Sequence, residues 1–255
     1  MISCILMCLL QLVTISWSQD VDYFKVDDLG YVYTLSQASL VKHSPKGDTL
    51  FVYSRMDLGM PSQLDVSNPL RPLIFFKQTG TMVLLDNTLS EQRVVRLFET
   101  GAGLPEWVAS GVNQEFWMFD ALNKELLRID ERMSVKANSG YLPNLLGREL
   151  LIVGLAERHE QVILADANYG LWIFDRFGGI AKRIPINGVL EMRTHASGIF
   201  LRTESGPLWY NYGAIEPEIF QNPKASTSKQ LFDAQNGKYF YLQAKKLQVQ
   251  YENAD

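Results

Sequence analysis

Short apolar runs separated by turn-forming residues recur along the whole chain. The runs are rich in β-branched, aromatic and aliphatic side chains, and Gly, Asn, Asp, Pro or Ser bound them, which is typical of short strands joined by tight turns. Apolar spacing of the helical kind is scarce. The pattern predicts an all-β protein with strands at residues 24–26, 31–33, 50–53, 73–76, 82–85, 94–98, 116–119, 150–154, 162–165, 171–174, 199–201, 208–210, 239–242 and 247–251.

One strand-pair pattern is repeated along the chain. Trp117-Met118-Phe119-Asp120 is followed by Arg128-Ile129, and Trp172-Ile173-Phe174-Asp175 is followed by Arg183-Ile184 at the same spacing. Weaker copies begin at Tyr31, Val83 and Leu208. Repeats of this kind bury the apolar face of each unit against the next unit, so the pattern predicts a β-propeller or a related repeat array. Because Trp117 and Trp172 recur at one strand position, we expect them to pack between blades rather than to stack on a ligand.

The best copy, residues 162–186, reads as three strands. Val162 to Asp166 ends in Ala-Asp, a turn through Asn168 and Gly170 follows, and the strand to Asp175 ends in Phe-Asp before Gly178-Gly179. This copy resembles the NHL-type repeat of six-bladed propellers, which implies four-stranded antiparallel blades. We expect six blades of about 40 residues each, with five as the alternative. Residues 20–26 are expected to complete the last blade, because an open ring would leave a sheet edge exposed.

The first eighteen residues differ from the rest of the chain. Residues 2–15 are almost wholly apolar, and Ser16 and Ser18 provide the small residues that precede a signal-peptidase cut. We predict a signal peptide over residues 1–18 and a single β-propeller domain over residues 19–255. A membrane anchor and a lipid on Cys8 are the alternatives, although the apolar run is shorter than the roughly 20 residues that span a bilayer. Both cysteines, Cys4 and Cys8, would be lost on cleavage.

Composition and charge narrow the class of function. Hydrophobic residues make up 47% of the chain and charged residues 20%, which excludes a disordered chain. The net charge of −4 argues against a nucleic-acid partner, which would require a basic face. The leader and the cysteine-free mature chain predict an exported bacterial protein that is periplasmic or associated with the outer membrane.

Residues for catalysis are sparse. The three histidines fall in different repeats, and no catalytic residue or cofactor is assigned. The acids Asp86, Asp120 and Asp175 each begin a polar turn, where an Asp side chain usually bonds its own backbone. Some six-bladed propellers are calcium-dependent lactonases whose oxygen ligands converge in the channel. That resemblance keeps a calcium-dependent lactonase-like hydrolase as the alternative, with a channel metal held by candidates Asp166, Asn168, Asp175 and His195.

The loops favour a binding protein. Residues 56–61, 65–70 and 139–146 carry Met, Leu, Tyr and Pro, which are costly to expose to water and often mark a contact surface. We therefore predict a non-enzymatic protein-interaction scaffold of the bacterial cell envelope. Its partner is expected to be another envelope protein, and contact with the membrane is expected only through that partner. The candidate contact residues are Met56, Leu58, Met60, Asp65, Asn68, Tyr141 and Leu142.

Overall fold

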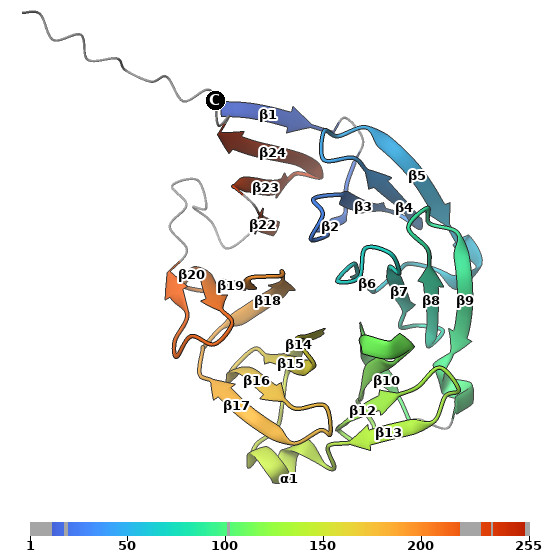
Figure 1. The fold of residues 1–255 in the computed structure, drawn as a ribbon, viewed down its shortest axis with the longest axis vertical. Coiled ribbons are helices and arrows are strands. Elements are labelled where there is room, and N and C mark those ends of the chain that lie inside the picture. The colour runs from blue at the N-terminus through green and yellow to red at the C-terminus, as the bar shows by residue number, and fades with distance from the viewer. Residues whose placement is uncertain (1–11, 18–19, 101–102, 220–230, 236, 253–255) are drawn as a thin grey trace, which may run out of the picture.

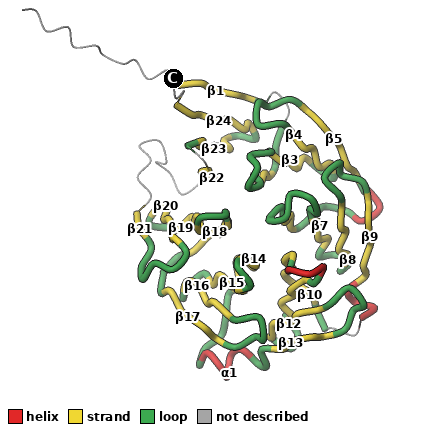
Figure 2. The backbone as a smooth tube through the Cα atoms, in the orientation of Figure 1, coloured by secondary structure: helices red, strands yellow, loops and turns green. Residues whose placement is uncertain are grey.

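The protein is a six-bladed β-propeller. The computed structural model describes residues 12–17, 20–100, 103–219, 231–235 and 237–252. Six four-stranded antiparallel sheets stand in a ring, as Figure 1 and Figure 2 show. This confirms the predicted fold class, blade number and strand count per blade. The prediction was possible because apolar runs and turn residues recur in every blade.

Each blade runs from an innermost strand beside the axis to an outermost strand at the rim. The first blade holds β2 (Tyr23–Val26), β3 (Val32–Ser36), β4 (Ser39–His43) and β5 (Thr49–Ser54). The second holds β6 (Gln63–Asp65), β7 (Leu73–Phe76), β8 (Thr81–Leu85) and β9 (Glu91–Arg96). The third holds β10 (Pro105–Ser110), β11 (Phe116–Asp120), β12 (Glu125–Ile129) and β13 (Val135–Asn138).

The remaining blades repeat this order. The fourth holds β14 (Ile152–Arg158), β15 (Gln161–Asp166), β16 (Gly170–Phe174) and β17 (Ile180–Ile184). The fifth holds β18 (Val189–Thr194), β19 (Gly198–Thr203), β20 (Gly206–Asn211) and β21 (Glu218–Ile219). The sixth holds β22 (Leu231–Gln235), β23 (Lys238–Gln243), β24 (Lys246–Glu252) and, as its outermost strand, β1 (Leu12–Ser16).

The ring closes differently from the expectation. Residues 20–26 were expected to complete the last blade, but β2 within that segment is the innermost strand of the first blade. The closing strand is β1, which pairs with β24 from Leu12 opposite Glu252 to Ser16 opposite Gln248. Pairing strands from the two ends of a chain removes an exposed edge from the ring.

Helical structure is confined to the connections. The α-helix α1 (Leu142–Leu146) and the 3₁₀ turns η1 (Met56–Leu58), η2 (Leu97–Thr100) and η3 (Val112–Gln114) make up the helices of the described residues. Residues 139–146 were expected to be a loop, but they hold α1, which follows β13. None of the described helices has the length and apolarity needed to cross a bilayer.

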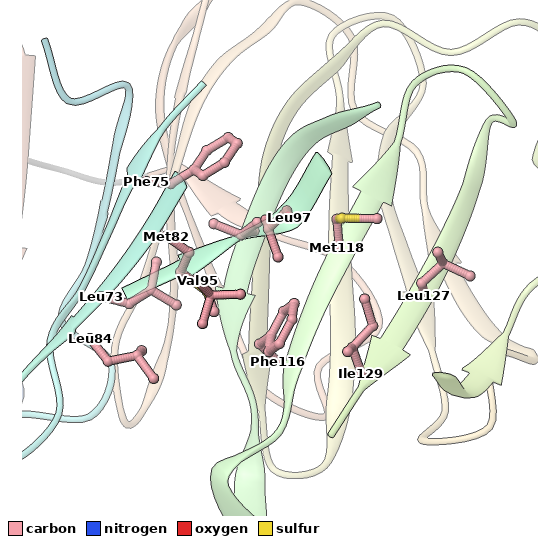
Figure 3. Packing of buried hydrophobic residues seen from close by; sticks show 11 residues of the cluster. Leu73, Phe75, Met82, Leu84, Val95, Leu97, Phe116, Met118, Leu127 and Ile129 are labelled. Atoms are coloured by element: carbon pink, nitrogen blue, oxygen red, sulfur yellow. The ribbon is translucent and has the colours of Figure 1, made fainter. Parts of the chain in front are cut away.

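The core lies between neighbouring blades. Figure 3 shows one such layer, in which Phe75 and Met82 of the second blade face Phe116 and Met118 of the third. Trp117 and Trp172 share the next layer, as their repeated strand position predicted. Apolar side chains that alternate along each strand are therefore buried against the adjacent blade, which explains why the repeats must stack to be stable.

The alternation of strand direction sorts the connections onto two faces of the ring. On one face, which we call the entry face, the chain passes from the outermost strand of one blade to the innermost strand of the next. These connections include residues 55–62, 97–104, 139–151 and 185–188. The exit face carries the connections that follow each innermost strand, as at residues 27–31, 66–72, 111–115 and 195–197.

Candidate functional site

The innermost strands surround a central cavity of about 400 Å³. Its wall is divided by chemistry. Trp107, Val153 and Leu155 supply an apolar side, while Lys25 and Glu191 are among its charged lining residues. A cavity of this size with mixed lining is large enough for a small ligand or for an inserted side chain of a protein partner.

Arg158 bridges four blades at the exit end of the cavity. It extends from the end of β14, and its Nη1 lies 2.7 Å from Asp28 Oδ2 of the first blade. The same nitrogen donates to the Ser67 carbonyl oxygen of the second blade at 3.3 Å, and Nη2 donates to the Thr194 carbonyl oxygen at 3.1 Å. The Ala196 backbone N–H also donates to Asp28 Oδ1, at 3.0 Å. A guanidinium suits this position because its planar fork donates in several directions at once.

A second buried charge cluster joins the fifth, sixth and first blades. Asp233 of β22 lies 2.7 Å from His195 Nε2 and 3.3 Å from Arg193 Nη1, and Arg193 also donates to the Phe24 carbonyl oxygen. Burial alone would raise the pKa of Asp233, but His195 and Arg193 lower that pKa to about 2. Burial would likewise lower the pKa of Arg193, but Glu191 and Asp233 raise it above its usual range. The cluster is therefore charged and internally compensated, which suits a structural tie between blades.

The four candidate metal ligands are divided between the two faces. Asp166 and Asn168 lie in the turn after β15 on the entry face, whereas Asp175 and His195 follow β16 and β18 on the exit face. Asp166 accepts the backbone N–H groups of Asn168 and Leu151, and the His195 ring stacks on Trp209. Within the described part of the chain, no group of three His, Cys, Asp or Glu side chains is placed to hold a metal ion.

The repeated Asp side chains accept hydrogen bonds from the backbone of their own turns. Asp86 Oδ1 accepts the N–H groups of Thr88 and Ser90, and Asp175 Oδ1 accepts those of Phe177 and Gly179. Asp120 Oδ1 accepts the Leu122 N–H in the same manner. These bonds hold the hairpin turns in place, which confirms the structural interpretation of the repeat.

The predicted contact residues differ in exposure. Met56 is 83% exposed and Met60 and Tyr141 are about half exposed, all three on the entry face. Leu58 packs against a core cluster, and Leu142 is 0% exposed, because the first turn of α1 folds back onto the third and fourth blades. The expectation of partner contact therefore does not hold for Leu142.

The predicted loop at residues 65–70 lies on the opposite face from the other two. Asn68 is exposed in the turn after β6, on the exit face. Asp65 Oδ1 accepts the Ser67 N–H at 2.8 Å, and Oδ2 accepts the Ser110 N–H of the third blade at 2.7 Å. Asp65 therefore connects two blades through its side chain.

The entry face carries exposed apolar side chains from the rim of the ring to the central cavity. A groove of about 530 Å³ adjoins the central cavity, and both are lined by Val153 and Leu190. Other large exposed hydrophobic residues precede the innermost strands on this face. We call the exposed set the entry-loop residues: Met56, Met60, Leu104, Leu151 and Leu190. An exposed apolar surface around a cavity is typical of a binding site.

Several charged residues that link blades through long-range contacts were missed by the sequence analysis. Arg158 and Asp28 are 130 residues apart, and Arg193 and Asp233 are 40 apart, so no local spacing connects them. Glu157 is also buried, and it accepts the Trp117 indole N–H at 2.7 Å. The sequence signal for Glu157 is that it and Arg158 are two charged residues at the end of an otherwise apolar strand.

Comparisons with known proteins identify the fold alone. No protein-family model and no curated protein matches the chain. Among solved structures, the chain is similar to BBS1N in complex with ARL6DN, at 10% identity and a TM-score of 0.58 over 91% of this chain and 78% of that one. It is similar to virginiamycin B lyase from Staphylococcus aureus, at 11% identity and a TM-score of 0.56 over 95% of this chain and 100% of that one. It is also similar to PorZ of Porphyromonas gingivalis, at 12% identity and a TM-score of 0.53 over 96% of this chain and 34% of that one.

Proposed function

We propose that this β-propeller is an exported protein-interaction scaffold of the bacterial cell envelope, and that it binds another envelope protein through its entry face. The observation that carries the proposal is the set of exposed apolar entry-loop residues, of which Leu190 also lines the central cavity. Removing such side chains from water is favourable by roughly 25 cal/mol per Å² of apolar area, and a partner protein supplies the surface that covers them.

Two similar structures support the class of function. BBS1N was solved in a complex with ARL6DN, and PorZ is described as a bacterial surface component of a type-IX secretion system. Their low identity to this chain means that the partner must be found from this chain's own surface. Export in our proposal follows the apolar leader, with cleavage after Ser18, and the mature protein is periplasmic or associated with the outer membrane.

The hydrolase alternative depends on a metal. Virginiamycin B lyase has a similar fold and is an enzyme, and the cavity here is large enough for a small ligand. A calcium-dependent lactonase would need oxygen ligands that converge on the cavity. Among the described residues, no group of three His, Cys, Asp or Glu side chains is placed to hold a metal ion. The scaffold is therefore the function that the site supports best.

The test compares the two faces of the ring. The full chain carries a C-terminal tag, is expressed in the envelope of a bacterial host, is crosslinked, and its bound proteins are identified by mass spectrometry. The test variant is Met56→Ser with Met60→Ser on the entry face. The matched control is Phe177→Ser with Ile215→Ser, which replaces exposed apolar residues of the exit-face connections after β16 and β20.

We expect one stoichiometric partner that persists in a calcium chelator, is lost from the entry-face variant and is retained by the control. Equal loss from both variants would show that general exposed hydrophobicity, not the entry face, causes the binding. A partner-free protein that releases bound calcium to the chelator would overturn the scaffold proposal and favour assays with lactone and ester substrates.

A further inference from the structure

The closing strand occupies a specific position on the sixth blade. Residues from Leu12 to Ser16 of β1 pair in register with β24, and the Trp17 N–H donates to the Leu247 carbonyl oxygen at 3.1 Å. β24 has β23 on one side and β1 on its outer edge, and no other strand of the described residues pairs with that edge. The backbone groups along that edge would otherwise be free to pair with another chain.

Two side chains of this segment bind between the sixth and first blades. Trp17 is buried, and its ring meets the His43 ring edge to face at a centroid distance of 5.5 Å. Ile15 packs over Gly47, where an added Cβ would approach Ile15 Cγ2 to 2.8 Å. The surrounding cluster contains Val21, Phe24, Val26, Val32, Phe240, Leu242, Leu247 and Val249. This site therefore selects an aliphatic side chain followed two residues later by an aromatic one.

The same residues belong to the proposed signal peptide. Cleavage after Ser18 would remove β1 and Trp17 together, which leaves the edge of β24 unpaired and uncovers the apolar cluster around Leu247 and Val249. We propose that the processed protein uses this vacated edge of β24 as an acceptor for an extended strand of a protein partner, which carries an aliphatic residue and an aromatic residue two positions on. The inference rests on the export step of the proposed function.

A heterologous strand fits the acceptor better than a second copy does. A second copy would bring its own β24 edge to this one, and the Leu247 and Val249 side chains of that strand pack against Phe240 and Leu242 of its own blade. Such a pairing would fill neither the Ile15 position nor the Trp17 position. Addition of a strand combines main-chain hydrogen bonds with pockets for alternate side chains, and both features are present at β24.

The test uses the processed protein and a peptide that stands in for the partner strand. The full chain with a C-terminal tag is expressed with export, purified from the envelope, and its N-terminus is sequenced. A fluorescent peptide of residues 11–18 is then titrated into the processed protein and followed by anisotropy. We expect saturable binding that weakens at least tenfold when the peptide carries Ile15→Asp or Trp17→Asp.

Three further peptides separate a paired strand from nonspecific adsorption. Thr14→Ser alters an exposed side chain and should bind as the parent peptide does. Trp17→Phe should also bind, because the Trp17 indole N–H has no hydrogen-bond partner among the described residues. A peptide N-methylated at Trp17 keeps both side chains but loses the donor to the Leu247 carbonyl, so its binding should weaken.

The result also distinguishes this inference from the proposed function. Failure of the processed protein to bind the parent peptide, or equal binding of all peptides, overturns the acceptor. A purified protein that retains residues 12–17 overturns it as well, since the edge is then never vacated. A dimer that dissociates on addition of the peptide would replace the partner strand with a second copy. None of these outcomes depends on the entry-face variants, which test the scaffold separately.

Discussion

Acid should destabilise this propeller through His43. The imidazole is buried at the end of β4, and its two nitrogens contact only hydroxyl groups, with Nε2 2.9 Å from Thr34 Oγ1 and Nδ1 3.4 Å from Thr49 Oγ1. Burial lowers the pKa of His43 from 6.5 to about 4. The folded state therefore holds His43 neutral over a pH range in which the unfolded state binds a proton.

The sign and size of the effect follow from proton linkage. Because the pKa of His43 is lower in the folded state than in the unfolded state, its contribution to the stability of the fold is complete above pH 6.5, the pKa of the unfolded state. That contribution is lost as the pH falls toward 4. At pH 5 the unfolded chain gains about 2 kcal/mol from protonation of this residue relative to the folded chain. The loss approaches about 3 kcal/mol below pH 4.

The measurement is urea denaturation at pH 7.5 and pH 5.0, for the chain with β1 in place and for His43→Gln. Gln keeps a hydrogen-bonding group beside Thr34 but does not titrate, so the packing cost of the substitution is present at both pH values and cancels. We expect the parent protein to lose about 2 kcal/mol more than the variant between the two pH values. Equal losses in the two proteins would refute the assignment of the pH dependence to His43.

Substitutions of Glu157, Leu142 and Asp175, each with a comparison variant, test the packing described above by urea or thermal denaturation. Glu157→Ala should cost about 2–4 kcal/mol because it leaves the Trp117 indole N–H buried without its acceptor, and Glu157→Gln should cost less than half of that; equal costs would contradict the role of the hydrogen bond. Leu142→Ala should cost about 2–5 kcal/mol, whereas Tyr141→Ala, on the exposed side, should change stability by no more than about 0.5 kcal/mol. Asp175→Ala should cost about 1–2 kcal/mol through the loss of two turn bonds, with Asp175→Asn in between; an unchanged stability would show that the turn holds without them.

The blades could be predicted because their signals are local. The strand from Leu171 to Phe174 consists of apolar residues. In the turn after it, the Asp175 side chain accepts a backbone N–H and Gly178 adopts a positive φ, and together they define that turn. Trp117 and Trp172 lie at the same spacing from the Arg of their own copy, and this equal spacing identified the repeat. Both rings pack in one layer. The number of blades followed from the number of copies.

The candidate site was only partly predictable. The exposed methionines at 56 and 60 lie where the sequence analysis placed a contact surface, because apolar residues in a long loop are visible in the sequence itself. The burial of Leu142 was not visible, because it depends on α1 folding back onto core residues such as Trp117 and Phe174, which come from two different blades. The sequence analysis could rank the loops but could not decide which side chain of a loop faces the solvent.

The sequence by itself determined the strand pattern, the turns and the repeat, because each depends on residues that lie within about ten positions of one another. Only the tertiary structure decided how the ring closes and what closes its channel. The contact of Arg158 with Asp28 and the pairing of Ser16 with Gln248 join residues that are far apart in the chain. Ring closure brings them together, and buried charges and sheet edges are stable only where such a partner is present.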